Sequence, residues 1–285
     1  MMKDSLFLPH TENEDDLYRA IQDDHHLKEF RTLLEKMWDG YKQYAPRGFR
    51  QNLQDSFHNR WWEMYLTLGI LQLGFDIATN KQDIGPDIKL IVGDSSLWME
   101  AVAPSKGEAS DRVPVQEPNT ATKMPKREGL LRLTQSILSK KEAFERYVRE
   151  SVVQVNEPCI IALSGCNLGL GDTLNSPCPA PMSILTGVDN LVLTPEGQYY
   201  TQRQSIQRDS GSVVDTAVFE NEDYQIISAV LYSYDEPLSA PNPRDSLKLF
   251  LNPHAKNPVP PHVYDKFVET WVYTIRDEAI GWDKV

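Results

Sequence analysis

Apolar residues recur at three- and four-residue steps in three segments of this chain of 285 residues, which is the period of an amphipathic helix. The pattern predicts helices over residues 14–44, 56–73 and 128–148. The second segment is apolar nearly all round, which is typical of a buried helix. A polar run with two adjacent histidines, His25 and His26, is a candidate break in the first helix. On an α-helix these two side chains would point in different directions, so we expect solvated polar residues there and no shared metal ion.

Shorter apolar runs bounded by turn residues predict the strands. Three of them follow the second helix in quick succession, at residues 75–79, 87–92 and 97–103, and the apolar run 159–164 suits a buried central strand. Residues 104–127 contain four prolines and no periodicity, which predicts a long surface loop. From residue 183 the chain turns β-rich, with predicted strands at 184–185, 191–193, 198–203, 213–219, 226–234 and 247–251 and a closing helix at 267–275.

The order of these elements predicts an α/β protein in which helices flank one mixed sheet. Its core, residues 55–165, would run helix, three strands, helix, strand. Residues 1–50 would form an N-terminal helical extension, and residues 183–285 a β-rich part packed on the core. No strong linker separates these parts, so we expect residues 1–285 to form a single domain.

Three carboxylates stand on the otherwise apolar elements of this core. Glu63 lies on the second predicted helix, Asp87 opens the second strand, and Glu100 lies inside the third. Acidic side chains rarely go inside a fold unless they are paired or hold a metal ion. The three therefore suggest one shared cation site. For Glu63 the sequence leaves open a local ion pair with Arg60, three residues earlier on the same helix.

A lysine lies within the apolar stripe of the third predicted helix. At about 100° per residue, Lys141 falls near the middle of the face formed by Leu133, Ile137 and Phe144, whereas Lys140 falls at its edge. One explanation for Lys141 is a side chain that buries its methylenes and carries its ammonium out to solvent. The other is an ammonium directed inward, towards the carboxylates.

The pair Pro86-Asp87, followed after twelve residues by Glu100, lies within the order helix, three strands, helix, strand. This combination resembles the PD-(D/E)XK nuclease-like superfamily, whose fold is called restriction-endonuclease-like, and it covers residues 55–165. The superfamily's third motif has a lysine two residues after the acid. This chain has Val102 at that position.

The resemblance implies a restriction-endonuclease-like fold in which Asp87 and Glu100 bind metal and act in catalysis. It implies Glu63 as a further metal ligand, since some branches add an acid from the helix. A different lysine would replace the missing one: Lys141, reaching in from the following helix, is the preferred candidate, and Lys106, in the loop, is the second. Oxygen ligands alone favour hard cations, so the expected ion is Mg²⁺ or Mn²⁺.

Three functions follow as alternatives. The first is metal-dependent hydrolysis of phosphodiester bonds in nucleic acid. The second is a nuclease-like domain without catalysis that binds nucleic acid or protein, which the replacement of the motif lysine by Val102 favours. The third is an enzyme of another kind or a structural protein.

Charge bears on the choice between these alternatives. The net charge of −12 argues against broad, non-specific binding of nucleic acid. Residues 123–149, however, hold eight Lys or Arg against three Glu, which is either a solvated helix face or a local basic patch beside the acidic site.

The remaining composition indicates where the protein works. Its three cysteines form no CxxC pair, so neither a disulfide framework nor a cysteine-rich zinc site is expected. No run of about 18 apolar residues predicts a membrane span, and the N-terminus lacks the apolar stretch of a secretory signal. A reducing cytoplasm fits best. The glycine-rich run 165–172 lacks the spacing of a phosphate loop, so we expect an ordinary loop.

Overall fold

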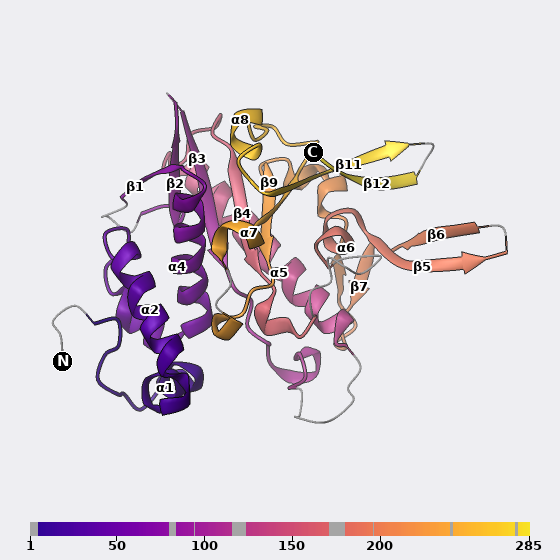
Figure 1. Cartoon of the computed structure of the whole chain (residues 1–285). Coiled ribbons are helices and arrows are strands. Elements are labelled where there is room, and N and C mark those ends of the chain that lie inside the picture. The colour runs from indigo at the N-terminus through magenta and orange to yellow at the C-terminus, as the bar shows by residue number, and fades with distance from the viewer. Residues whose placement is uncertain are drawn as a thin grey trace.

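The computed structural model describes residues 5–79, 84–93, 95–115, 124–170, 180–195, 197–239, 242–276 and 279–285. Its N-terminal part is helical (Figure 1). The helices are α1 (Asp16–Asp23), a 3₁₀ turn (His25–Leu27), α2 (Lys28–Tyr41), α3 (Phe49–Asp55) and α4 (Phe57–Gln72). Asp15 caps α1 and Asp24 caps the 3₁₀ turn, each by accepting from backbone N–H groups. These two caps divide the long predicted helix at the position of the polar run.

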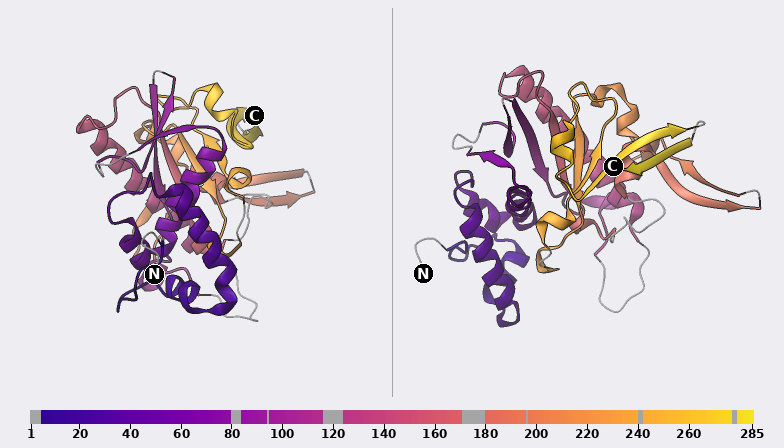
Figure 2. Two further views of the ribbon diagram at one scale, coloured as in Figure 1. Left: turned by 60° about the vertical axis from the view of Figure 1, so that its left-hand side comes forward. Right: turned by 45° about the horizontal axis from the view of Figure 1, so that its top comes forward.

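A mixed sheet forms the centre of the molecule (Figures 1 and 2), and among the described residues it has eight strands in the order β1-β2-β3-β4-β9-β10-β11-β12. Strands β3, β4 and β9 are parallel to one another, and β1–β2, β2–β3, β9–β10 and β11–β12 are antiparallel pairs. The strands are β1 (Asp76–Ala78), β2 (Ile88–Val92), β3 (Ser95–Val102), β4 (Cys159–Ser164), β9 (Ala229–Ser233), β10 (Lys248–Leu251), β11 (Glu269–Arg276) and β12 (Ala279–Lys284).

The helix α5 (Lys126–Arg149) connects β3 to β4, and the long segment between β4 and β9 carries most of the remaining elements. That segment contains α6 (Ala180–Thr186) and two antiparallel hairpins. The hairpins are β5 (Val188–Thr194) with β6 (Gly197–Gln202), and β7 (Ser205–Gln207) with β8 (Val213–Asp215). Short helices α7 (Pro243–Ser246) and α8 (Pro261–Tyr264) flank β10.

The two faces of the sheet have separate apolar cores. Side chains alternate along β3, so Leu97 and Met99 pack with α4 on one face, whereas Trp98 packs with α5 on the other. Trp62 of α4 fixes the first face, because its indole N–H donates to the Ala162 carbonyl of β4 at 3.0 Å. This alternation places Glu100 on the α5 face, as its position after Trp98 predicts.

The predicted α/β class and the order helix, three strands, helix, strand are confirmed. The prediction of a strand at 184–185 is wrong, because these residues belong to α6, and α3 was not predicted. The predicted closing helix 267–275 is also wrong. There β11 pairs with β10 and β12, and its β-branched and aromatic residues suit a pleated surface. The predicted loop 104–127 contains a 3₁₀ turn (Ala109–Asp111), and its residues 116–123 lie outside the described part.

Two further observations concern the cysteines and the helices. Cys159 and Cys166 are buried free thiols, and Cys178 lies outside the described residues. None of the helices in the described part combines the length and apolar character needed to cross a membrane.

Gly165 follows β4 at a point where there is no room for a side chain. A Cβ there would lie 2.8 Å from Cζ of Tyr232, whose residue is only 1% exposed. We expect Gly165→Ala to lower the free energy of unfolding by about 1–3 kcal/mol, because the buried ring must shift. Urea unfolding measures this change.

The matched control is Gly281→Ala in β12. A Cβ there would meet the nearest side-chain atom, Oγ1 of Thr274, at an ordinary 3.7 Å. If both variants unfold at the same urea concentration, the steric explanation for Gly165 is wrong.

Candidate functional site

The site lies where β2 separates from β3. The last pair in their register is Ile88 with Met99, and the next pair would be Asp87 with Glu100. Here the carboxylate of Asp87 replaces a strand partner, because its Oδ2 accepts from the backbone N–H of Ala101 at 2.7 Å. This bond holds Asp87 against the edge of β3, next to Glu100.

The backbone amide just after β3 is also satisfied by a side chain. The N–H of Ala103 donates to Oδ1 of Asn59, on α4, at 3.0 Å. Two side chains therefore cover the edge of β3 that β2 has left, which keeps the strands apart at this end.

Glu100 is buried with one oxygen paired and the other not. Lys140 of α5 donates from Nζ to Oε1 at 2.8 Å. The residue Glu100 is 6% exposed, and its Oε2 has no hydrogen-bond partner among the described residues. Burial, together with the charge of Asp87, raises the pKa of Glu100 to about 7, although Lys140 opposes this shift. A buried carboxylate oxygen without a donor calls for a proton or a cation.

Glu63 lies on the other face of the sheet, with both oxygens in hydrogen bonds. The Tyr41 hydroxyl donates to Oε1 at 2.6 Å, and Arg60 donates from Nη1 to Oε2 at 2.5 Å. Glu63 is 4% exposed, and burial followed by the charge of Asp87 raises its pKa to about 7. The local Arg60–Glu63 pair, which the sequence left open, is therefore formed.

The three predicted carboxylates form a row in which Asp87 stands between the other two. Its negative charge raises the pKa of both Glu63 and Glu100. They do not gather into one tight cluster, however: among the described residues, the group of His, Cys, Asp or Glu whose ligand atoms all lie within 4.8 Å of one another is a different one. The row ends in a cation on each side, at Arg60 and at Lys140.

The prediction that Lys141 reaches these carboxylates is wrong. Its Nζ pairs with Oε1 of Glu145 at 2.9 Å and lies 5.6 Å from the ring centroid of Tyr224. At this end of α5, the centre of the apolar stripe, at Lys141, thus faces the segment between β4 and β9. The edge of the stripe, at Lys140, faces the end of β3. The second candidate, Lys106, lines a different cavity together with His58.

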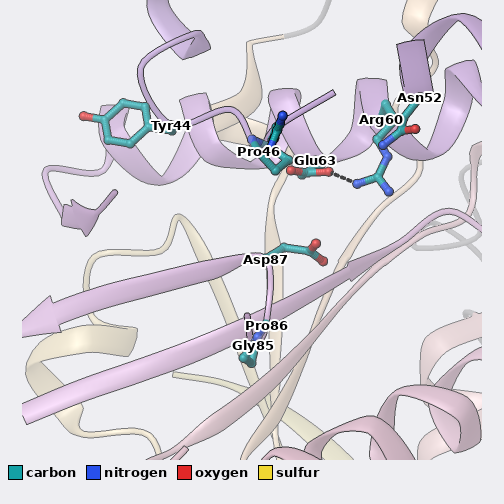
Figure 3. A pocket seen from close by; sticks show the side chains of 9 residues that line it. Tyr44, Pro46, Asn52, Arg60, Glu63, Gly85, Pro86 and Asp87 are labelled. Atoms are coloured by element: carbon teal, nitrogen blue, oxygen red, sulfur yellow. Dashed lines mark hydrogen bonds and ion pairs between the residues drawn. The ribbon is translucent and has the colours of Figure 1, made fainter. Parts of the chain in front are cut away.

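A polar cavity of about 280 Å³ adjoins Asp87 on the α4 side. Figure 3 shows Asp87, just before β2, facing Glu63 and Arg60 of α4 across this space. Its other wall comes from the segment between α2 and α4. The complete lining is Tyr44, Pro46, Arg47, Asn52, Arg60, Glu63, Gly85, Pro86 and Asp87.

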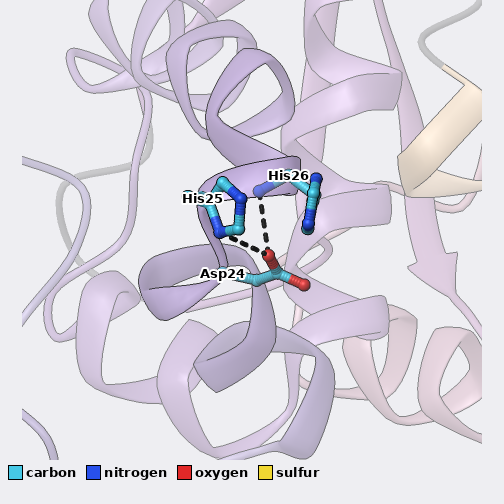
Figure 4. Close-up of side chains that lie close together, drawn as sticks. All are labelled: Asp24, His25 and His26. Atoms are coloured by element: carbon cyan, nitrogen blue, oxygen red, sulfur yellow. Dashed lines mark hydrogen bonds and ion pairs between the residues drawn. The ribbon is translucent and has the colours of Figure 1, made fainter.

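Asp24, His25 and His26 are the group that does lie within 4.8 Å (Figure 4). The 3₁₀ turn brings the two imidazole rings to 3.7 Å between centroids, which differs from the α-helical geometry that the sequence predicted. All three residues are exposed, as expected, and Asp24 already accepts from the His26 N–H as the cap of the turn.

The basic residues of α5 are largely used inside the protein. Arg127 contacts Asp111 and Asp209, and Lys126 contacts Asp189 at 2.8 Å. Together with the lysine on Glu100, these contacts show that much of the positive charge of this helix holds neighbouring elements in place. For these three residues, neither a solvated helix face nor a free basic patch, the two interpretations that the sequence left open, describes the contacts.

Comparison with protein-family models, with curated proteins and with solved structures found no match to this chain.

Proposed function

We propose that this chain hydrolyses phosphodiester bonds in nucleic acid with a divalent cation, at a PD-(D/E)XK-like site in which Lys140 replaces the lysine absent at Val102. The observation that carries the proposal is Glu100. Its one oxygen is held by Lys140, its other oxygen is buried without a hydrogen-bond partner in the described part of the chain, and Asp87 lies beside it. A restriction-endonuclease-like core is part of this proposal.

The residues fit a hard cation. Asp87 and Glu100 offer only carboxylate oxygens, which favours Mg²⁺ or Mn²⁺ over zinc. A cation at Oε2 of Glu100 would satisfy the buried oxygen and offset the repulsion between the two acids. Glu63, which the sequence predicted as a further ligand, has Tyr41 and Arg60 on its two oxygens, so we assign it the role of fixing Arg60.

When bound, the divalent cation would lower the pKa of a water molecule and neutralise charge on the phosphate. The chain supplies the rest. Burial lowers the pKa of Lys140, but the charges of Glu100 and Asp87 raise it, and the net direction is upward. Its ammonium therefore stays protonated at neutral pH and can stabilise negative charge on a phosphate oxygen. Glu100 orients that ammonium through the 2.8 Å hydrogen bond.

The dependence of cation binding on pH tests the site. The pKa of Glu63 and of Glu100 is raised from 4.5 to about 7. Protonation of these two carboxyl groups therefore stabilises the metal-free fold at pH values below that range, and this stabilisation is lost as pH rises through about 7. Mn²⁺ binds the ionised carboxylates, so its stabilising effect should appear as the protons leave. We expect Mn²⁺ at about a hundred times its Kd to raise Tm by roughly 5 °C at about pH 8, and by much less at about pH 5.5.

Thermal melts with and without Mn²⁺ measure this effect, and Glu100→Gln is the control that should abolish it. The unmodified protein should cleave a labelled oligonucleotide in the presence of Mn²⁺ or Mg²⁺, and a chelator should abolish this cleavage. A Tm that Mn²⁺ leaves unchanged at both pH values would overturn the metal site, and cleavage that persists in chelator would overturn the mechanism.

The second candidate function is a nuclease-like module that binds nucleic acid or protein without cleaving it. Val102 in the motif position is the observation that favours it. Binding of Mn²⁺ through Asp87 and Glu100 without any cleavage of single-stranded or duplex nucleic acid would support this candidate instead of the first.

A further inference from the structure

We infer that the polar cavity beside Asp87 takes one unpaired nucleotide, so that the substrate of the proposed nuclease is single-stranded nucleic acid rather than duplex. This inference rests on the proposed function and names its substrate class. It comes from the walls of the cavity, from its size and from the way it meets Asp87.

The cavity has a fixed cation on one wall. Tyr41 holds Glu63, and Glu63 holds Arg60, through two hydrogen bonds of 2.6 and 2.5 Å. A guanidinium has five N–H donors in a rigid fork that suits phosphate oxygens, and Nη1 is the group that contacts Glu63. Because its carboxylate partner is buried and fixed, Arg60 presents this fork in a defined orientation.

The other lining residues add groups that suit the rest of a nucleotide. The segment after α2 contributes the phenol ring of Tyr44 and the guanidinium of Arg47, and α3 contributes the amide of Asn52. Bases stack on aromatic rings, and amides bond to base edges. Phosphate would thus meet Arg60 while the base lies against Tyr44.

The size of the cavity suits one nucleotide and not a base pair. Its volume of about 280 Å³ lies just below the range of pockets that enclose drug-sized ligands. The walls come from α4, from the segment between α2 and α4, and from the residues before β2, and we expect them to obstruct the approach of a base pair. A nucleotide can reach Asp87 through this space only if it is unpaired.

The charge elsewhere on the chain also favours a single strand over a duplex. Duplex binding by contacts to both phosphate backbones requires a broad basic surface. The chain carries a net charge of −12, and Lys126, Arg127 and Lys140 of α5 are engaged with acidic residues of the protein. A small cavity with two arginines is therefore better suited to one strand.

Fluorescence anisotropy tests the inference with the full chain. The probes are a fluorescein-labelled oligothymidine and an oligouridine of about 12 nucleotides, a length within the site sizes of single-strand binders, and the oligothymidine annealed to its complement. Ca²⁺ replaces Mg²⁺ as the hard cation. We expect at least one single strand to bind about tenfold more tightly than the duplex, and the two single strands distinguish DNA from RNA. Equal or tighter binding of the duplex would overturn the inference.

Arg60→Gln should weaken single-strand binding by about tenfold. Arg47→Gln is a second variant on an exposed residue that keeps the Glu63 pair intact, and the control is Arg244→Gln, an exposed arginine of α7 outside the cavity lining. If both cavity variants bind like the Arg244 control, the cavity is not the binding place. The Mn²⁺ melting shift of the unmodified chain separates the two proposals: its absence contradicts the proposed function, whereas its presence with a duplex preference contradicts only this inference.

Discussion

Replacing Asp87 by Asn is expected to reduce cleavage by about a thousandfold or more, because the proposed cation loses the charge of its central ligand. The fold should survive. The asparagine keeps a side-chain oxygen that can accept from the Ala101 N–H, as Oδ2 of Asp87 does at 2.7 Å. Oligonucleotide cleavage in Mg²⁺ and thermal melts of the metal-free protein are the measurements.

The metal-free variant should be at least as stable as the unmodified chain at about pH 8. Burial raises the pKa of Asp87 itself, and the charge of Asp87 raises the pKa of Glu63 and of Glu100, so its removal relieves repulsion among these buried acids in the pH range where they are ionised. Asp76→Asn is the matched control, since it removes the same charge from an exposed position on the neighbouring strand β1. Cleavage by the Asp87 variant at the rate of the Asp76 variant would end the metal-site proposal.

The core could be predicted because its elements carry strong local signals. Helix α4 is apolar nearly all round and buried, and β4 is a fully buried apolar run. The C-terminal part lacked such a signal. Residues 267–275 suit either a helix or a strand by spacing alone, and pairing with β10 and β12 decides for a strand. That pairing is non-local, so periodicity within the segment could not reveal it.

The site could be predicted in part for a similar reason. A buried acid is visible in the sequence as an acid among apolar residues, which identified Glu63, Asp87 and Glu100. Their hydrogen-bond partners cannot be read from the sequence. Tyr41, for example, lies 22 residues before Glu63, on another helix. Spacing along the chain could pair Glu63 only with Arg60, three residues earlier, and that ion pair does form.

The choice between two adjacent lysines shows the same limit. Helical periodicity shows which residues of α5 share its apolar stripe. It does not show how the helix is rotated about its axis relative to the sheet. Lys140, at the stripe edge, meets Glu100, while Lys141, at the stripe centre, meets Glu145 and Tyr224. Position along α5 could not have separated them either, because adjacent residues differ by only about 1.5 Å along the helix axis.

The pair Lys140→Met and Lys141→Met turns this difference into a measurement. Lys140→Met should lower the cleavage rate by roughly a hundredfold or more, because the ammonium that would stabilise the phosphate charge is lost. It should also leave Oε1 of Glu100 without its ammonium donor, next to an Oε2 that has no hydrogen-bond partner in the described part. The pKa of Glu100 should then rise further, and Mn²⁺ binding should require a higher pH.

Lys141→Met removes the same charge from the next residue and should leave cleavage within about a factor of two. Its ion pair with Glu145 is an i,i+4 helix pair, which contributes about 0.3–0.5 kcal/mol. Single-turnover cleavage and the pH profile of Mn²⁺ binding compare the two variants, and Lys140→Arg, which keeps a charged donor near Glu100, should restore part of the rate. An equal loss in both variants, or a larger loss in Lys141→Met, would show that the ammonium on Glu100 has no special place in the reaction.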